Sequence, residues 1–188
     1  MRRLLIAVTV AFLLGGLFPV GALAGVPEAQ GQSLSVDEDH DLLVELEAID
    51  ASGEAVTVFT PQQPSHGSVS ETGSIVCDAQ TPNTCTQEWT YSPDENFNGS
   101  DSFTFTATSE GAASAPATVS ITVNAVNDDP TFTVGPNVEV DEDSGPYIGN
   151  GFITDGSPGP ADESGQSLAY VVTADTTSLF SAQPAISA

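Results

Sequence analysis

The eight residues DSFTFTAT, at positions 101–108, carry the clearest structural signal in this chain. Their apolar side chains, Phe103, Phe105 and Ala107, alternate strictly with serine and threonine. Successive side chains of a β-strand point to opposite faces, so this order buries one face and leaves the other in water. Aromatic and β-branched residues also favour strands. We therefore predict a strand here, with its aromatic face packed in a core.

The same alternation recurs in other parts of the chain. Apolar residues with this spacing are Leu42, Val44 and Leu46; Val56 and Val58; Trp89 and Tyr91; and Val119, Ile121 and Val123. Glycine and proline separate these stretches at turn positions, and no segment has helical periodicity. Many short alternating strands within about 100 residues predict an all-β fold, an antiparallel sandwich of two sheets packed face to face.

The tetrapeptide Val-Asp-Glu-Asp occurs twice, at 36–39 and at 140–143. Asp37 and Asp141 lie 104 positions apart, about one domain length, so each copy marks the start of a repeat.

The second repeat is too short to be a full copy of the first. After Pro130 only 58 residues follow, with one clear strand at 168–173 and no counterpart of the aromatic stretch. We expect a flexible polar lead-in at 25–32, a sandwich at 33–129 and the incomplete start of a second repeat at 130–188. An incomplete sandwich would leave an open strand edge, so the sequence reads as a fragment of a longer array.

The first 24 residues read as a secretory signal peptide. Arg2 and Arg3 precede an apolar run, and the small residues Ala22 to Ala24 supply a cleavage site. The alternative is a membrane anchor, but glycines interrupt the apolar run, which is short for a span of about 20 apolar residues. We expect cleavage after Ala24 and a secreted or cell-surface location.

The charge is strongly unbalanced, with 26 acidic residues against two basic ones and a net charge of −24. Both basic residues, Arg2 and Arg3, belong to the expected signal peptide. A chain of this charge is repelled by nucleic acid and by anionic lipid, which excludes both as partners. Bound cations would offset the self-repulsion; the alternative is a salt-adapted surface that binds nothing in particular.

The two cysteines, Cys77 and Cys85, lie close together in an exported chain. Oxidising conditions favour a disulfide between them, which would contribute roughly 2–3 kcal/mol in the chain-entropy model. Two cysteines without a nearby second pair or histidine make a poor zinc site, so a structural disulfide is the better prediction.

Two motifs resemble the bacterial cadherin-like and immunoglobulin-like tandem repeats of large secreted adhesins. Those repeats carry a Tyr-x-Pro-x-x-x-Phe-x-Gly-x-Asp-x-Phe run and a closing Val-Asn-Asp-x-Pro. The matching residues are Tyr91, Pro93, Phe97, Gly99, Asp101 and Phe103, and then Val126, Asn127, Asp128 and Pro130. The match covers about residues 33–130, and the rest of the chain matches as the start of another repeat.

This resemblance implies calcium ions at the junctions between repeats, where they would stiffen the linker. The residues that match the family's ligand positions are Glu38, Asp101, Asn127 and Asp128, with Asp50 corresponding loosely to an acidic turn. Calcium takes six to eight oxygen ligands, which a cluster of carboxylates and amides at strand ends can provide. The alternative is that these side chains simply cap turns.

The resemblance favours a non-catalytic, calcium-binding structural and adhesion module, whose partners are adjacent repeats and surface glycans or proteins. The alternative is a carbohydrate-binding accessory domain of a secreted enzyme, for which Tyr147, Phe152 and Tyr170 are the spare aromatics. An enzyme is the third choice. His40 and His66 share no motif, and no nucleophile-elbow pattern is present.

Overall fold

The computed structural model describes residues 25–186, so the predicted signal peptide lies outside the described residues. The chain divides into two compact units, the first ending at Val126 and the second beginning at Asn127. Among residues 25–186, no helix is long and apolar enough to cross a membrane.

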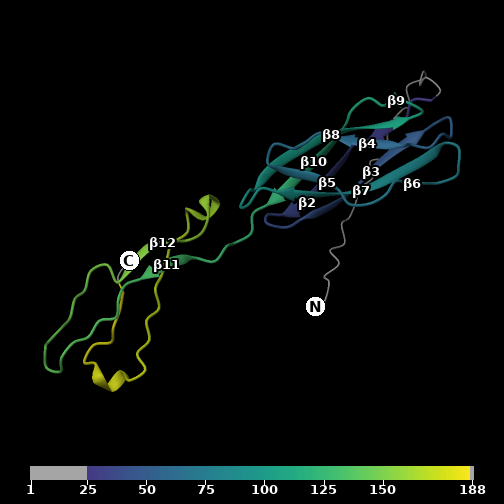
Figure 1. The fold of residues 1–188 in the computed structure, drawn as a ribbon. Coiled ribbons are helices and arrows are strands. Elements are labelled where there is room, and N and C mark those ends of the chain that lie inside the picture. The colour runs from purple at the N-terminus through teal and green to yellow at the C-terminus, as the bar shows by residue number, and fades with distance from the viewer. Residues whose placement is uncertain (1–24, 187–188) are drawn as a thin grey trace. The chain divides into compact units, whose positions relative to one another are not determined.

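The first unit is a sandwich of two sheets (Figure 1). One sheet has the strand order β1-β3-β7-β5, with β6 also paired to β7. The other has the order β2-β10-β8-β4, with β9 also paired to β8. The bounds are β1 Glu28–Gln30, β2 Gln32–Asp37, β3 Leu42–Asp50, β4 Val58–Pro61, β5 Gly67–Glu71, β6 Val76–Cys77, β7 Asn83–Pro93, β8 Gly99–Ser109, β9 Ala112–Ala113 and β10 Ala117–Asn124. The predicted all-β, immunoglobulin-like sandwich is confirmed. Its pairs are antiparallel except β2 with β10, which run parallel.

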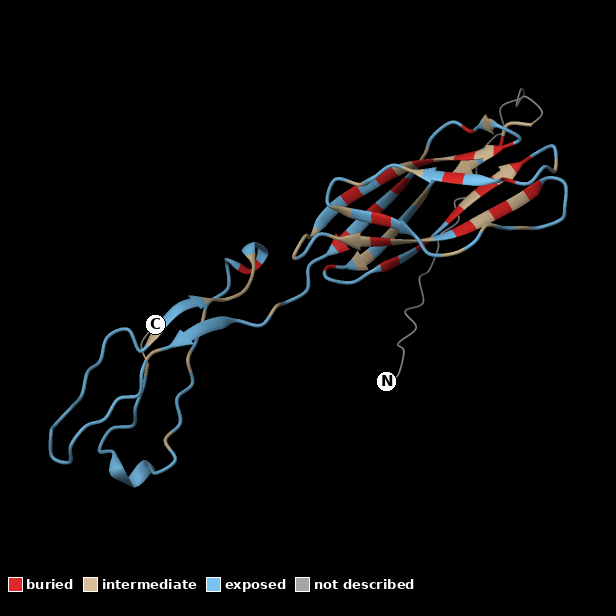
Figure 2. Ribbon diagram, in the orientation of Figure 1, coloured by how far each residue is buried: buried red, intermediate tan, exposed pale blue. Residues whose placement is uncertain are grey.

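The core lies between the two sheets, where inward-facing residues alternate with exposed ones along each strand (Figure 2). The buried apolar residues are Leu42, Val44, Leu46, Ala48, Val56, Phe59, Val69, Cys85, Tyr91, Phe103, Phe105, Ala107, Val119, Ile121 and Val123. Trp89 is partly buried against this core. The prediction that Val58 faces the core is wrong. Val58 is 47% exposed, because β4 begins there and turns Phe59 inward instead.

The polar stretch at 25–32, predicted to be a flexible lead-in, instead contains β1 and the start of β2. β1 pairs with β3 in one sheet, and β2 pairs with β10 in the other. The chain changes sheets at Gly31, where a Cβ atom would lie 2.9 Å from the Thr118 carbonyl oxygen. Backbone pairing needs no apolar side chain, which is why hydrophobic periodicity did not reveal this edge strand.

Cys77 and Cys85 form the predicted disulfide. Cys77 lies in β6 directly opposite Cys85 in β7, so the bond joins two neighbouring strands. The Val56 amide donates to the Cys85 sulfur at 3.3 Å. The disulfide therefore holds the short strand β6, and the loop that follows it, against the core.

The second unit has one small antiparallel sheet, formed by β11, Thr131–Val134, and β12, Ile153–Ser157. Two short 3₁₀ helices follow, η1 at Ala161–Glu163 and η2 at Thr177–Leu179. The strand predicted at 168–173 is wrong, since these residues form no strand and Val171 is 90% exposed. In the described part of this unit, the single buried residue is Glu163.

Candidate functional site

The first Val-Asp-Glu-Asp tetrapeptide closes one end of the sandwich. Each of its three acids accepts a hydrogen bond. Asp37 accepts from the Asn124 side chain at 3.0 Å and Glu38 from the Val126 amide at 2.6 Å, both at or just past the end of β10, and Asp39 accepts from the Asn96 amide, between β7 and β8, at 2.9 Å. Asp39 has a left-handed backbone, with φ of 58°, which Asp tolerates better than most residues. The tetrapeptide is therefore a turn whose carboxylates hold neighbouring strand ends together.

Glu38 is the buried member of this turn, with 1% of its surface exposed. Besides the Val126 amide on Oε1, the Asn98 side chain lies 3.4 Å from Oε2. The Glu38 amide itself donates to the Asn124 carbonyl at 2.9 Å, which extends the β2–β10 pairing by one residue. A buried carboxylate is tolerated when N–H donors replace its hydration, and such charge-assisted bonds are short and strong.

Asp101 lies inside the same end of the sandwich and accepts four hydrogen bonds. Oδ1 accepts from the amides of Ser65 at 3.2 Å and Ser102 at 2.8 Å, and Oδ2 from the His66 amide at 3.1 Å and the Tyr91 hydroxyl at 3.0 Å. Burial, together with the carboxylate of Asp101, raises the pKa of the Tyr91 hydroxyl well above its usual value. Through the amides of Ser65 and His66, Asp101 fixes the loop before β5.

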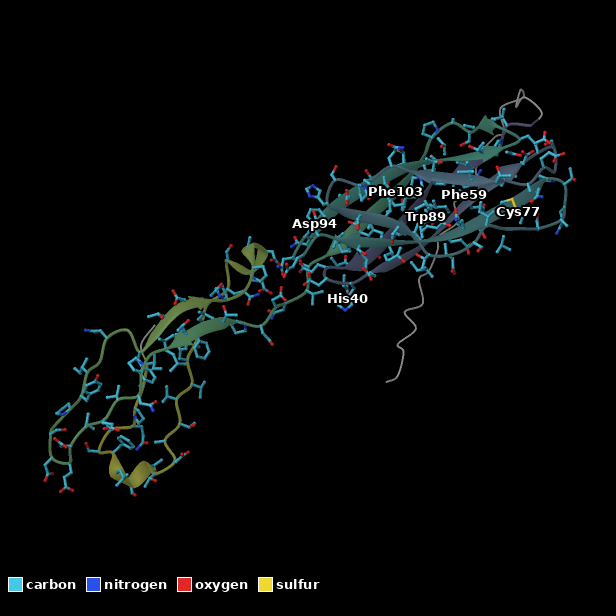
Figure 3. All side chains as sticks on the ribbon, in the orientation of Figure 1. His40, Phe59, Cys77, Trp89, Asp94 and Phe103 are labelled. Carbon is cyan, nitrogen blue, oxygen red and sulfur yellow. A yellow bond between two sulfur atoms is a disulfide. The ribbon has the colours of Figure 1, made fainter. Side chains whose placement is uncertain are left out.

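Asp50 lies at the opposite end of the first unit, because β3 runs the length of the sandwich from Leu42 to Asp50. Its carboxylate accepts hydrogen bonds from the Ser52 amide, at 2.8 Å, and from the Ser52 hydroxyl. Burial raises the pKa of Asp50, but these bonds and weaker ones from Ser109 and the Glu54 backbone outweigh it and hold the pKa below its usual value. Figure 3 shows how far apart the two ends are, with His40 and Asp94 at one and Cys77 at the other.

Asn127 and Asp128 belong to the second unit, where their partners come from the segment after β12, at 158–166. The Asp128 amide donates to Glu163 Oε1 at 2.6 Å, and the Asn127 side-chain oxygen accepts from Gln166 at 3.1 Å. Glu163 is only 4% exposed. A side chain at Gly159, where φ is +155°, would collide with the Glu163 carboxylate.

The sequence alone counts Glu163 among further acids of the second unit but does not make it a site residue, because its acidic loop is typical of solvated chain. One signal could have found it: the pattern Asp-x-Ser-Gly occurs at 50–53 and again at 162–165. In the first unit this pattern forms the acidic turn after β3. Its second occurrence indicates that the loop holding Glu163 is part of the repeat.

The five predicted calcium ligands are thus divided over three places. Glu38 and Asp101 lie at one end of the first unit, Asp50 lies at the other end, and Asn127 and Asp128 lie in the second unit. Within residues 25–186, no three side chains of His, Cys, Asp or Glu are grouped closely enough to hold a metal ion. The calcium site stays a prediction.

The histidines and the spare aromatics have local roles. His40 is hydrogen-bonded through Nδ1 to the Glu38 carbonyl at 2.9 Å, and the His66 ring stacks on Phe97 with centroids 4.2 Å apart. Tyr147 is 58% exposed and Phe152 40% exposed. Tyr170 packs edge-on against Phe132, with ring centroids 5.9 Å apart.

Residues 25–122 match a family model described as a bacterial Ig domain. Among solved structures, an endo-fucoidan hydrolase from glycoside hydrolase family 107 is 19% identical over 54% of this chain, with a TM-score of 0.36. The chain spans only 14% of the length of that hydrolase. The PapD-like domain 7 of human CEP192 is 10% identical, with a TM-score of 0.36, covering 62% of this chain and 98% of that domain. No curated protein sequence matches the chain significantly.

Proposed function

Because the chain belongs to the bacterial Ig domain family, we propose that it is a non-catalytic structural and adhesion module of an exported repeat protein. The observation that carries this proposal is that buried acidic side chains hold the fold together. In the first unit, Glu38 and Asp101 are buried and hold the protein's own backbone. The tetrapeptide that contains Glu38 then recurs in the second unit, as expected of a spacer built from repeats.

An extracellular or cell-surface location is part of the same proposal. Bacterial Ig domains are often found outside the cell or on its surface. A chain with 26 acidic and two basic residues also suits a soluble exported protein. Adjacent repeats of the same protein are its first expected partners. Surface glycans or proteins would be bound by the array as a whole.

Calcium binding is the finer part of the proposal, and Glu163 gives it support. Its Oε2 atom is buried and has no hydrogen-bond partner among the described residues. An unsatisfied buried carboxylate oxygen is costly, and a hard cation with oxygen ligands would offset that cost. Asp128 and Asn127 hold bonds to the same loop and would contribute oxygens. In the first unit, Glu38 and Asp50 are the predicted ligands that remain, since four donors already surround the Asp101 carboxylate.

Titration of the full chain with calcium tests this part. We expect saturable heat of binding by calorimetry, and a higher melting temperature in calcium than in EDTA. Glu163→Gln removes the charge of the buried oxygen and is expected to weaken binding at least tenfold. Asp162→Asn is the matched control, because Asp162 is the exposed neighbour in the same helix η1. An equal effect of both variants, or no response of the wild type to calcium, would contradict calcium binding. The proposal of a structural module would not be affected.

A further inference from the structure

The peptide bond between Asp129 and Pro130 differs chemically from every other peptide bond of the chain. The sequence contains 13 prolines, and only Pro130 follows an aspartate. Asp129 stands at the variable position of the closing Val-Asn-Asp-x-Pro motif, so the family pattern does not require an acid there. The bond lies in the stretch without helix or strand between β10, which ends at Asn124, and β11, which begins at Thr131. It is therefore a feature of this chain at the junction of its two units.

Both residues of this bond are exposed, and the chain is held on either side of it. On the N-terminal side, the Asp128 amide donates to Glu163 Oε1 at 2.6 Å. On the C-terminal side, β11 begins to pair with β12 at Thr131. Within the described residues, the Asp129 carboxylate has no hydrogen-bond partner. Its side chain can therefore turn toward its own backbone carbonyl without breaking a contact.

An aspartate before a proline has the groups needed for an intramolecular cleavage. A carboxyl oxygen of Asp129 attacks the carbonyl carbon of the same residue, which closes a cyclic anhydride and breaks the bond to the Pro130 nitrogen. The leaving nitrogen takes up a proton and becomes the secondary amine of a new N-terminus. Water then opens the anhydride, so the overall reaction is the hydrolysis of one peptide bond. Acid favours this reaction, because the tertiary amide nitrogen of an X-Pro bond departs together with a proton.

We propose that the bond between Asp129 and Pro130 is a self-cleavage site, which in acid separates the first unit from residues 130–188. The cut leaves the sandwich intact, because the bond that closes its end, from the Val126 amide to Glu38, lies before the cut. The reaction occurs once per chain and needs no catalytic site, so it is compatible with a non-catalytic module. It depends neither on the repeat organisation nor on calcium. The exported location proposed above would supply only the acidic surroundings.

Incubation of the full chain in EDTA tests the proposal, at neutral pH and in mild acid where the fluorescence of Trp89 is still that of the folded state. We expect fragments to accumulate only in acid, with a first-order rate that does not change with chain concentration. Mass spectrometry should identify one product that ends at Asp129 and one that begins at Pro130. EDTA separates this test from the calcium titration, so either can fail alone.

Two variants identify the reacting groups. Asp129→Glu moves the carboxyl group one carbon farther from the carbonyl, and Pro130→Ala replaces the tertiary amide by an ordinary one, so each is expected to slow cleavage at least tenfold. Asp175→Glu is the matched control that leaves the rate unchanged, because Asp175 is an exposed aspartate that no proline follows. The proposal would be overturned by a wild-type rate in Asp129→Glu or Pro130→Ala, by an absence of cleavage in acid, or by cleavage that begins only after the Trp89 signal reports unfolding. A rate that rises with chain concentration would also overturn it.

Discussion

Asp101 illustrates how a single acid can organise one end of a sandwich. Its short side chain starts from β8 and reaches both the loop amides of Ser65 and His66 and the buried hydroxyl of Tyr91. Four donors around one carboxylate compensate for the loss of water on burial. Two of the four bonds, from the amides of Ser65 and His66, orient the loop that leads into β5. The hydrogen bonds of Asp101 therefore give its carboxylate a role in stabilising the fold.

Replacing this carboxylate tests its role. Asp101→Asn keeps the shape but turns one acceptor into an NH₂ group that faces two donors, so we expect a loss of about 2–3 kcal/mol in the free energy of unfolding. Tyr91→Phe removes one bond and should cost about 1 kcal/mol. Urea unfolding followed by the fluorescence of Trp89, the single tryptophan, measures both. Asp94→Asn, at an exposed residue of the same end, is the control. A loss from Asp101→Asn no larger than that of the control would contradict this role.

Single residues were also where sequence reasoning was weakest. Glu38 and Glu163 both belong to acidic stretches that look solvated in sequence, and both are buried. Burial of a carboxylate depends on donors that arrive from distant segments, such as Val126 for Glu38, 88 positions away. Local sequence gives no sign of such a donor. The family resemblance pointed to Glu38, as a calcium ligand and not as a structural acid, and only the repeated Asp-x-Ser-Gly pattern could have pointed to Glu163.

At the level of elements, alternation predicted the strands whose two edges are paired and failed where pairing is absent. β8 and β10 each have a partner on both sides, and their alternating residues face the core as predicted. Residues 168–173 have a similar pattern but form no strand, because an apolar face has nothing to pack against in the second unit. β1 was missed for the opposite reason, since its polar residues pair through the backbone alone. Period-two patterns thus report burial and only indirectly report strands.

The disulfide acts on one element, the two-residue strand β6. Removing it with the pair Cys77→Ala and Cys85→Ala should lower the free energy of unfolding by about 2–3 kcal/mol, because the unfolded loop is no longer closed. Exchange of amides in residues 74–84 should become faster, while β8 and β10 stay protected, since they belong to the other sheet. Val76→Ser, at a neighbour 67% exposed, controls for changes on β6 itself. Unchanged stability and unchanged exchange in 74–84 would show that β6 does not need the bond.

On the scale of the whole molecule, all buried apolar side chains of the described residues belong to the first unit. That unit has two sheets and a continuous core, which is what independent stability requires. The second unit has a two-stranded sheet and one buried residue, a glutamate, so none of its described apolar side chains is buried. The sandwich could be predicted from sequence, and the repeat organisation stays a prediction. The division of the five predicted calcium ligands among three places could not be predicted from sequence. It follows from where β3 ends and from where the first unit ends.

The central claim is that this module uses its buried acids to close its own fold. The most direct test is the free energy of unfolding of the full chain in EDTA, for wild type, Glu38→Gln and the exposed control Glu45→Gln. The account predicts a loss of about 1–3 kcal/mol for Glu38→Gln, with faster hydrogen exchange at the Val126 amide, and little change for Glu45→Gln. A Glu38→Gln variant as stable as wild type, with the Val126 amide still protected, would contradict it.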